Sequence, residues 1–387
     1  MPLLRLLATI AALALSSQAS ALTYVVSSLA DSGPNTLRQA VLDANANAGL
    51  DDIQFSVTGT IVLTSGELVV TDSVNILGPG ARSLAVSANL NSRVLRLAGG
   101  AAKDVLVSGL TFTDGLTNGN GGAILNEAGN LTLRDMRIVG NQTAAEGGAI
   151  YNQFFDCCNV LTIENSELSL NRANKNGAIF FIGYQLRIAN STIYNNIATD
   201  SVGAIFILFG DAVIRNSTIA ANNANLVGGI QSQDSLLTLE SVILAGNTDI
   251  TGINDINRTG AGTVNATNSL FEEDVTATSV INGTDSGNLV AVDPLLGPLA
   301  NNGGPTDSLR PGAGSQALGN GSNSQGYAYD QRGPGYPRDA GGAVDIGAIQ
   351  RALPPPSVVP VPALALAPLA LLSVLIAALG MALGRRR

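Results

Sequence analysis

The sequence Gly-Gly-Ala-Ile at 121–124 returns as Gly-Gly-Ala-Ile at 147–150, and this repetition decides the fold. Degenerate copies follow at 176–179, 202–205 and 227–230, so that successive copies begin 26, 29, 26 and 25 residues apart. Self-similarity with a period of about 20 to 50 residues is typical of solenoids and other repeat architectures. The glycines that we attribute to the repeat are Gly122, Gly148, Gly177, Gly203 and Gly229.

Two further apolar segments follow each copy. The first reads Leu131-Thr-Leu133 after the first copy, and the second ends in the pattern Ile/Leu-x-x-Asn. Alternating apolar and polar residues between Gly and Asn turns predict short β-strands, two or three in each repeat. We expect the asparagines to form a ladder at a turn, because Asn tolerates left-handed dihedral angles. These residues are Asn141, Asn171, Asn196 and Asn222.

A unit of about 26 residues cannot bury its own apolar face, so its copies must stack on one another. Parallel stacking predicts an all-β fold, a right-handed parallel β-helix over residues 50–292 with about nine rungs. A propeller would need about 40 residues and four strands in each blade, which the spacing does not offer. Before the solenoid, residues 22–49 predict a strand and an amphipathic capping helix over 36–46.

The composition excludes several kinds of chemistry. The 387 residues include no histidine and no tryptophan, and the net charge is −9. Without histidine the chain cannot build a Ser-His-Asp or Cys-His system or a metal site that needs imidazole. The negative charge argues against a nucleic-acid partner. We expect no cofactor.

Both ends of the chain predict processing. Residues 1–21 have the features of a secretory signal peptide, with cleavage between Ala21 and Leu22 after the small residues Ala-Ser-Ala. A Pro-rich linker at 351–362 precedes residues 363–387, whose uncharged run is long enough to cross a membrane. This predicted transmembrane helix is followed by Arg385, Arg386 and Arg387, as the positive-inside rule requires of a cytoplasmic end.

The order Val-Pro-Val-Pro-Ala, hydrophobic segment and terminal arginines resembles the IPTL-CTERM and PEP-CTERM sorting signals of bacteria; its prolines are Pro360 and Pro362. That resemblance implies cleavage by an exosortase-like membrane protease, followed by attachment to the cell surface or outer membrane, or by release. A permanent single-span anchor is the alternative.

Three other regions resemble parts of bacterial surface proteins. Residues 29–45 are similar to the start of pectin-lyase-like β-helix surface proteins, and the motifs over 112–247 resemble the GGA(I/L/V) and FxxN repeats of the polymorphic outer membrane proteins. The turn-rich succession at 293–350, which includes Asn-Asn-Gly-Gly-Pro-Thr and ends in Gly-Ala-Val-Asp-Ile-Gly-Ala, resembles the choice-of-anchor Q domain. These resemblances imply a β-helix closed by a C-terminal module.

A catalytic site on such a solenoid would need acids in register on consecutive rungs. Asp135, Glu164 and Glu240 occupy nearly equivalent places, but Ala189 and Arg215 stand at the rungs between them. We therefore favour a solvated outer face over a catalytic row. The acids of the repeat region are Asp104, Asp114, Asp135, Glu146, Asp156, Glu164, Glu167, Asp200, Asp211, Asp234 and Glu240, and the lysines considered as bases are Lys103 and Lys175.

Three smaller features have a structural and a functional interpretation. Arg38 and Asp43 are more simply the polar face of a helix than site residues. Cys157 and Cys158 are adjacent in an inserted loop and allow a strained vicinal disulfide, an intermolecular disulfide or free thiols. An aromatic cluster is explained by packing more simply than by sugar binding; it comprises Tyr151, Phe154, Phe155, Phe180, Phe181 and Tyr184.

The sequence predicts an exported β-helix protein attached to the cell surface, acting as a non-enzymatic adhesin or display protein. Its expected partners are the sorting protease and an extracellular polysaccharide or a host or matrix surface. The alternative is a polysaccharide lyase or glycoside hydrolase on the same fold, because the fold alone does not separate binding from catalysis.

Overall fold

The computed structural model of the protein describes residues 20–99, 103–153, 159–339 and 342–351. All of them belong to the compact unit that ends at Arg351. Cys157, Cys158 and the predicted sorting signal lie outside the described residues, and so does most of the predicted signal peptide. Within the described part, no helix is long and apolar enough to cross a membrane.

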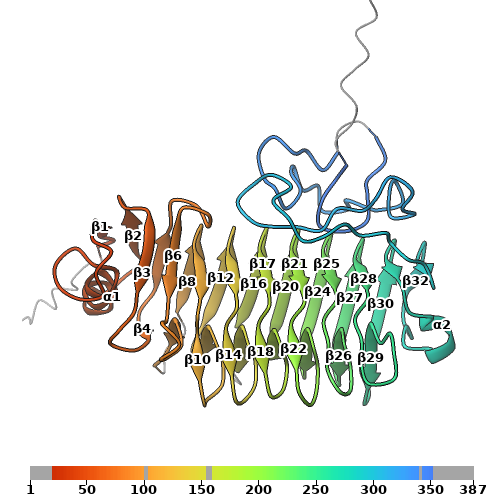
Figure 1. Ribbon diagram of the computed structural model, residues 1–387, viewed down its shortest axis with the longest axis horizontal. Helices are drawn as coiled ribbons and strands as arrows, with labels where there is room; N and C mark the ends of the chain where they lie inside the picture. The colour runs from red at the N-terminus through yellow and green to blue at the C-terminus, as the bar shows by residue number, and fades with distance from the viewer. Residues whose placement is uncertain (1–19, 100–102, 154–158, 340–341, 352–387) are drawn as a thin grey trace, which may run out of the picture. The chain divides into compact units, whose positions relative to one another are not determined.

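Four parallel sheets run side by side along the molecule (Figure 1). Sheet A has eleven strands: β1 (Thr23–Val26), β2 (Asp51–Phe55), β5 (Val74–Leu77), β8 (Asp104–Ser108), β12 (Asn130–Arg134), β16 (Val160–Glu164), β20 (Gln185–Ala189), β24 (Asp211–Arg215), β27 (Leu236–Glu240), β30 (Thr263–Thr267) and β32 (Asp285–Ser286). Sheet B has ten: β3 (Gly59–Val62), β6 (Leu84–Ser87), β9 (Thr111–Thr113), β13 (Arg137–Val139), β17 (Glu167–Ser169), β21 (Thr192–Tyr194), β25 (Thr218–Ala220), β28 (Ile243–Ala245), β31 (Leu270–Phe271) and β33 (Leu289–Val290).

The third side of the solenoid is shared by two shorter sheets. Sheet C has eight strands: β4 (Leu68–Val70), β7 (Leu95–Leu97), β11 (Ile124–Asn126), β15 (Ile150–Gln153), β19 (Ile179–Ile182), β23 (Ile205–Leu208), β26 (Ile230–Gln233) and β29 (Ile256–Thr259). Sheet D has four: β10 (Leu116–Thr117), β14 (Gln142–Thr143), β18 (Arg172–Ala173) and β22 (Ile197–Ala198). The prediction of an all-β parallel solenoid of the right-handed type, with about nine turns, is confirmed.

The register of the sheets follows the repeat. Ile124 lies opposite Ile150 in sheet C, and Ile150 lies opposite Ile179, so equivalent isoleucines stack inside the solenoid. All three side chains are fully buried. The 25-residue spacing of the copies at 202–205 and 227–230 is confirmed, since Ile205 pairs with Ile230. The choice of Gly229 was wrong, because this register places Gly228 opposite Gly203.

Glycine is required at this place by the close approach of neighbouring rungs. A Cβ atom on Gly148 would collide with the carbonyl oxygen of Gly177, and one on Gly177 with that of Gly203. Gly203 meets the carbonyl oxygen of Gly228 in the same way. Because the obstacle is backbone on each rung, no side chain can be accommodated without a shift of the coil.

The four predicted asparagines form a buried ladder. The Nδ2 of Asn171 donates to the Oδ1 of Asn196 at 2.9 Å, and Asn196 donates to Asn222 at the same distance. The conformational reason given for them was wrong, because the left-handed residue is the one before each ladder asparagine, as at Leu170 and Asn195. The ladder residues instead satisfy buried backbone groups at the bend that follows sheet B.

Helix α1 (Leu37–Ala46) lies at the N-terminal end of the solenoid (Figure 1). Thr36 caps it by accepting a hydrogen bond from the N–H of Gln39, and its buried face packs against β1, β2 and β4. Arg38 lies on the polar face of α1, as expected, and it also links the helix to other segments. It pairs with Asp31 at 2.8 Å and donates to two carbonyl oxygens of the neighbouring turn, those of Gly66 and Glu67.

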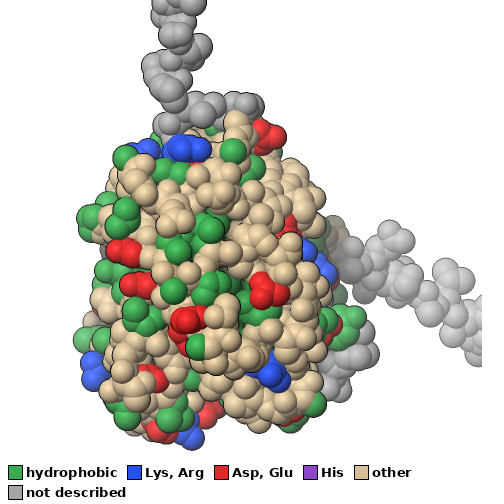
Figure 2. All heavy atoms as spheres, turned by 90° about the vertical axis from the view of Figure 1, so that its right-hand side faces the viewer, with side chains coloured by type: hydrophobic (Ala, Val, Ile, Leu, Met, Phe, Trp, Pro, Cys, Tyr) green, Lys and Arg blue, Asp and Glu red, His purple; other side chains and the backbone are tan. Residues whose placement is uncertain are grey.

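Beyond β33 lie residues 293–350, which we call the tail module, and its described residues, 293–339 and 342–350, form no strand of the four sheets. Figure 1 shows the module, in blue, along the edge of the solenoid where β17, β21, β25 and β28 begin. At the end of the solenoid that carries α2 (Val275–Thr278), acidic side chains are spread among neutral and hydrophobic ones (Figure 2).

Candidate functional site

The corner at which sheet A turns into sheet B carries the tail module, and we call this junction the seam. At each rung the corner residue adopts a left-handed conformation, with φ of 52° at Asn165, 47° at Asn190 and 44° at Asn216. This conformation is one that Asn adopts more readily than most residues. Asn190 and Asn216 use their amide groups to donate to the carbonyl oxygens of Tyr329 and Ser322, at 3.2 Å and 2.8 Å. The corner asparagines therefore both shape the turn and hold the module.

Arg338 links the module to the solenoid through a buried charge. Its guanidinium is fully buried and donates to the carbonyl oxygens of Gly347 and Ala348, at 2.8 Å and 2.7 Å, and to the Oδ1 of Asn190 at 2.6 Å. Burial lowers the pKa of Arg338 to about 10, which still leaves the group charged at neutral pH. The carbonyl dipoles of the module hold this buried charge, and its hydrogen bond to Asn190 joins the module to the β20–β21 turn.

The row of acids noticed in the sequence is a row of ion pairs. Arg134, Glu164, Ala189, Arg215 and Glu240 lie opposite one another on five consecutive strands of sheet A. The Nε of Arg134 lies 3.0 Å from Glu164, and the Nε of Arg215 lies 3.0 Å from Glu240. Asp135, which we had placed near this row, lies one residue beyond it at the corner.

Glu240 also reaches the tail module. Its Oε1 accepts hydrogen bonds from the hydroxyl of Ser322 at 2.9 Å and from the N–H of Ser324 at 3.3 Å. Burial alone would raise the pKa of Glu240, but the hydrogen bonds from Ser324, Ser322 and Arg215 outweigh it and hold this pKa below its usual value. The carboxylate is therefore ionised and serves as a link between the solenoid and the module.

Between these ion pairs and the module lies a polar groove. Its larger part has a volume of about 460 Å³ and its smaller part about 230 Å³, and both are lined by Glu164 and Tyr327. Arg187, Arg215 and Gln325 line the larger part, and Asp135 lies in the smaller. Burial is the main cause that raises the pKa values of Tyr327 and Asp135. Such a groove offers hydrogen-bond donors and charges of both signs to a polar ligand.

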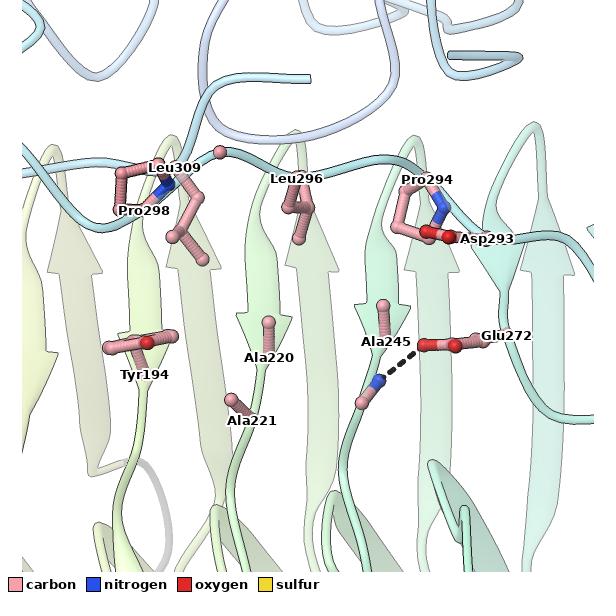
Figure 3. Close-up of a pocket in the computed structure, with 12 residues that line it drawn as sticks. Tyr194, Ala220, Ala221, Ala245, Glu272, Asp293, Pro294, Leu296, Pro298 and Leu309 are labelled. Carbon is pink, nitrogen blue, oxygen red and sulfur yellow. Dashed lines mark hydrogen bonds between the residues drawn. The ribbon is translucent and has the colours of Figure 1, made fainter. Parts of the chain in front are cut away.

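A second hollow, of about 310 Å³, lies between sheet B and the first segment of the module. Figure 3 shows Pro294, Leu296 and Leu309 on the module side, facing Tyr194 and small alanines on the strands. Glu272 stands at one end and accepts a hydrogen bond from the N–H of Gly246 at 2.7 Å. The apolar walls suit the hydrophobic face of a small ligand.

The remaining acids of the repeat region do not gather into one site. Glu167 is fully buried, pairs with Arg137 at 2.7 Å and accepts from the N–H of Asp307 at 3.1 Å. Asp104, Asp114 and Asp234 accept hydrogen bonds from Asn130, Ser87 and Ala261, whereas Asp200 and Asp211 are exposed. Glu146 lies opposite Lys175 in an isolated backbone bridge, and Asp156 lies outside the described residues. No cluster of potential metal ligands occurs in the described part of the chain.

Lys103, which the sequence offered as a candidate base, makes structural contacts. Its side chain is buried and its Nζ donates to the carbonyl oxygens of Ala98 at 3.0 Å and Ala128 at 3.2 Å. Burial lowers the pKa of Lys103. These contacts connect consecutive turns at sheet C, away from the seam.

The aromatic residues separate into two environments. Phe181 belongs to the main core, whereas Tyr151 and Phe180 stack outside it with ring centroids 4.7 Å apart. Each of these two stacked residues is only 6% exposed, so neither offers an open ring face to a sugar. Tyr184 is 55% exposed and lies outside both of these clusters. Phe154 and Phe155 lie outside the described residues.

The seam itself was not predicted from the sequence. Arg187, Tyr327 and Arg338 carry no local motif, and Arg338 meets Asn190 across 148 residues of chain. The sequence signal was the turn-rich composition of 293–350, and nothing in it marked Arg332 and Arg338, which the structure buries.

No family model matches the chain, and no curated protein matches it. Among solved structures, the crystal structure of Jun a 1, the major allergen from cedar pollen, is similar to it, with 16% sequence identity and a TM-score of 0.38. The match covers 68% of this chain and 78% of the allergen. The class of the protein, a parallel β-solenoid, rests on its own sheets and register, and no residue role is transferred from the allergen.

Proposed function

We propose that the protein is an exported β-helix attached to the cell surface, and that it acts as a non-enzymatic adhesin or display protein. Its partner is an extracellular polysaccharide or a host or matrix surface. The observation that carries this proposal is the use of the acids at the seam as structural ion pairs. Glu164, Glu167 and Glu240 each bind an arginine at 3.0 Å or less.

These contacts favour binding over catalysis for a physical reason. A general acid needs a raised pKa, and a nucleophilic carboxylate needs access to its substrate. Glu240 has a lowered pKa and Glu167 is fully buried, so neither suits these roles. Both instead connect the solenoid to the tail module, which supports a rigid display surface.

The polar groove is the proposed binding surface. Arg187 is exposed at its floor, and Tyr327 and Gln325 come from the module above it. A guanidinium can bind hydroxyl or carboxylate oxygens of a sugar chain, and a tyrosine offers both a ring and a hydroxyl group. We therefore expect a polysaccharide, in preference a uronate-containing one, to bind here.

The first prediction concerns this groove. Full-length protein in detergent is assayed on a panel of neutral and uronate-containing polysaccharides by biolayer interferometry. Arg187→Ala and Tyr327→Ala should each weaken binding about 10-fold, since each removes a hydrogen bond of about 1.5 kcal/mol or a stacking contact. Arg172→Ala, which changes an exposed arginine of sheet D outside the groove, is the matched control. Equal binding by all three variants would contradict the proposal.

Export and surface attachment have their own test, intact-mass analysis of the protein from host membrane and medium fractions. A chain that begins at Leu22 and ends near Pro360 supports leader removal and cleavage by an exosortase-like protease. A chain that retains Arg387 in the inner membrane would support a permanent anchor instead.

The second candidate function is a polysaccharide lyase or glycoside hydrolase. It is favoured by one observation, the presence of Glu164, Arg187 and Tyr327 in the same groove. If the polysaccharide that binds is also degraded, and Glu164→Gln abolishes product formation while binding persists, the adhesin proposal is wrong and the enzyme proposal replaces it.

A further inference from the structure

The solenoid begins beside a carboxylate that is buried without a cation. Asp51 is the first residue of β2 and is 0% exposed. Its Oδ1 accepts hydrogen bonds from the backbone N–H of Leu22 and from the Nδ2 of Asn47, both at 2.8 Å. Its Oδ2 is buried without a hydrogen-bond partner, and no ion pair among the described residues includes Asp51. An ionised carboxylate in this state is costly unless a positive charge reaches it.

The donor is the residue at which the exported chain is expected to begin. Leu22 immediately precedes β1, whose Thr23 lies opposite Asp52, and the N–H of Asp52 donates to the carbonyl oxygen of Leu22 at 2.8 Å. Parallel pairing thus holds the backbone nitrogen of Leu22 against Asp51. Hydrolysis after Ala21 would create a new terminus at this nitrogen without any rearrangement of β1.

We propose that Asp51 is the binding site for the α-ammonium group of Leu22, formed when the Ala21–Leu22 peptide bond is hydrolysed during export. This inference rests on the export proposed above. Hydrolysis by the leader-removing endopeptidase consumes one water molecule: Ala21 leaves with a carboxylate, and the new amine of Leu22 takes up a proton.

The change of chemistry at this nitrogen explains the unsatisfied oxygen. An amide N–H offers one proton and no charge, whereas an ammonium group offers three protons and a positive charge. The mature terminus can therefore bind both oxygens of Asp51. Processing fastens β1 to the end of the solenoid, so the cleaved chain is more stable than the chain that retains its leader.

The pairing has a pH signature. An unpaired α-amino group has a pKa of about 8, and a buried carboxylate partner raises it. The stabilisation is fully present below about pH 8 and is lost as the pH rises through the raised pKa. The titratable or charged groups on the neighbouring segments are Tyr24 on β1, Asp52 on β2, Arg38 and Asp43 on α1, and Asp72 before β5. Burial raises the pKa of Tyr24, and the charges of Asp51 and Asp43 raise it further, so the test uses Tyr24→Phe as its background.

The experiment compares two chains that differ only in their first residue. One begins at Leu22 and the other at Ala19, both run to Arg387 in detergent, and both are released from a fusion by a protease that leaves no extra residue. At pH 6.5 the unfolding equilibrium constant in urea should be about 10-fold to 100-fold smaller for the chain that begins at Leu22. The difference should fall below about 3-fold in Asp51→Asn, and it should shrink as the pH is raised to about 10.

Two results overturn the inference in different ways. If the exported protein begins at Leu22 but the two chains unfold alike at pH 6.5 and pH 10, the pairing with Asp51 is wrong and the export proposal survives. If the exported protein begins elsewhere, the cleavage site is wrong, and the inference fails together with that part of the proposed function. Should Asp51→Asn not fold, the difference in pH dependence between the chains that begin at Leu22 and at Ala19 still decides, because Tyr327 and the other groups that titrate in this range are common to both chains.

Discussion

At the scale of single residues, Asp255 should make the folded protein more stable in acid than at neutral pH. It is fully buried where the asparagine ladder ends, and its Oδ1 accepts from the Nδ2 of Asn247 at 2.8 Å. Burial raises the pKa of Asp255 to about 6. Because this folded-state pKa lies above the unfolded value of about 3.9, the folded state binds more protons between these values and its stability falls as the pH rises through them. About 3 kcal/mol of stability present at pH 3.5 should therefore be absent at pH 7.

The measurement is the urea midpoint as a function of pH in the wild type and in Asp255→Asn. The variant loses a titratable group but keeps a carbonyl oxygen for the N–H groups of Glu272 and Glu273, which lie 3.1 Å and 3.0 Å from Asp255. The difference between the two profiles should carry the slope, since the lowered pKa values of Asp31 and Glu240 act in the opposite sense in both proteins. Parallel profiles between pH 3.5 and pH 7 would show that Asp255 does not titrate in this way.

At the scale of elements, the asparagine ladder should contribute more to stability than its exposed neighbours. Asn196 donates to Asn222 and to the carbonyl oxygen of Leu168, and it accepts from both nitrogens of Asn171, all at about 3 Å. Asn196→Ala would leave these buried groups unsatisfied, so we expect a loss of about 3 kcal/mol or more in the free energy of unfolding.

The matched control is Asn223→Ala. This asparagine is exposed, and its Nδ2 donates to Thr248 of the next turn. Its loss should cost about 0.5 kcal/mol or less. A denaturant titration in which the two variants lose equal stability would contradict a structural role for the ladder.

The solenoid could be predicted because its elements repeat, and its errors arise where the repeat is locally ambiguous. Val-Gly-Gly-Ile at 227–230 contains two glycines, and only the pairing of Ile230 with Ile205 identifies Gly228 as the stacked one. The pattern Ile-x-x-Asn located the ladder but not its dihedral angles, because the bend falls on the residue before each asparagine. The polar groove could not be predicted, since Tyr327 and Glu164 belong to segments that no sequence period relates.

At the scale of the whole described unit, the tail module and the solenoid depend on one another. The described residues of the module contribute no strand to the four sheets, and some of its buried polar groups bond to the first residues of sheet B strands. The Oε1 of Gln331 accepts from Thr192, and the N–H of Ala348 donates to Thr218. The solenoid in turn uses Glu167 and Glu240 to bind the module. The groove exists only while the two are joined, because Tyr327 comes from one and Arg187 from the other.

Arg338→Met tests this dependence. The substitution keeps much of the side-chain volume but removes the charge and leaves the Oδ1 of Asn190 and two carbonyl oxygens unsatisfied. We expect a loss of about 3 to 5 kcal/mol at the seam, faster proteolysis within 293–350 than within the solenoid, and weaker polysaccharide binding. Arg310→Met, at an exposed arginine of the same module, should change none of these. Limited proteolysis with mass analysis of the fragments separates the outcomes: a wild-type fragment pattern in Arg338→Met would mean that the module is held without its buried charge, whereas early cuts confined to 293–350 would mean that this arginine joins the two parts of the binding surface.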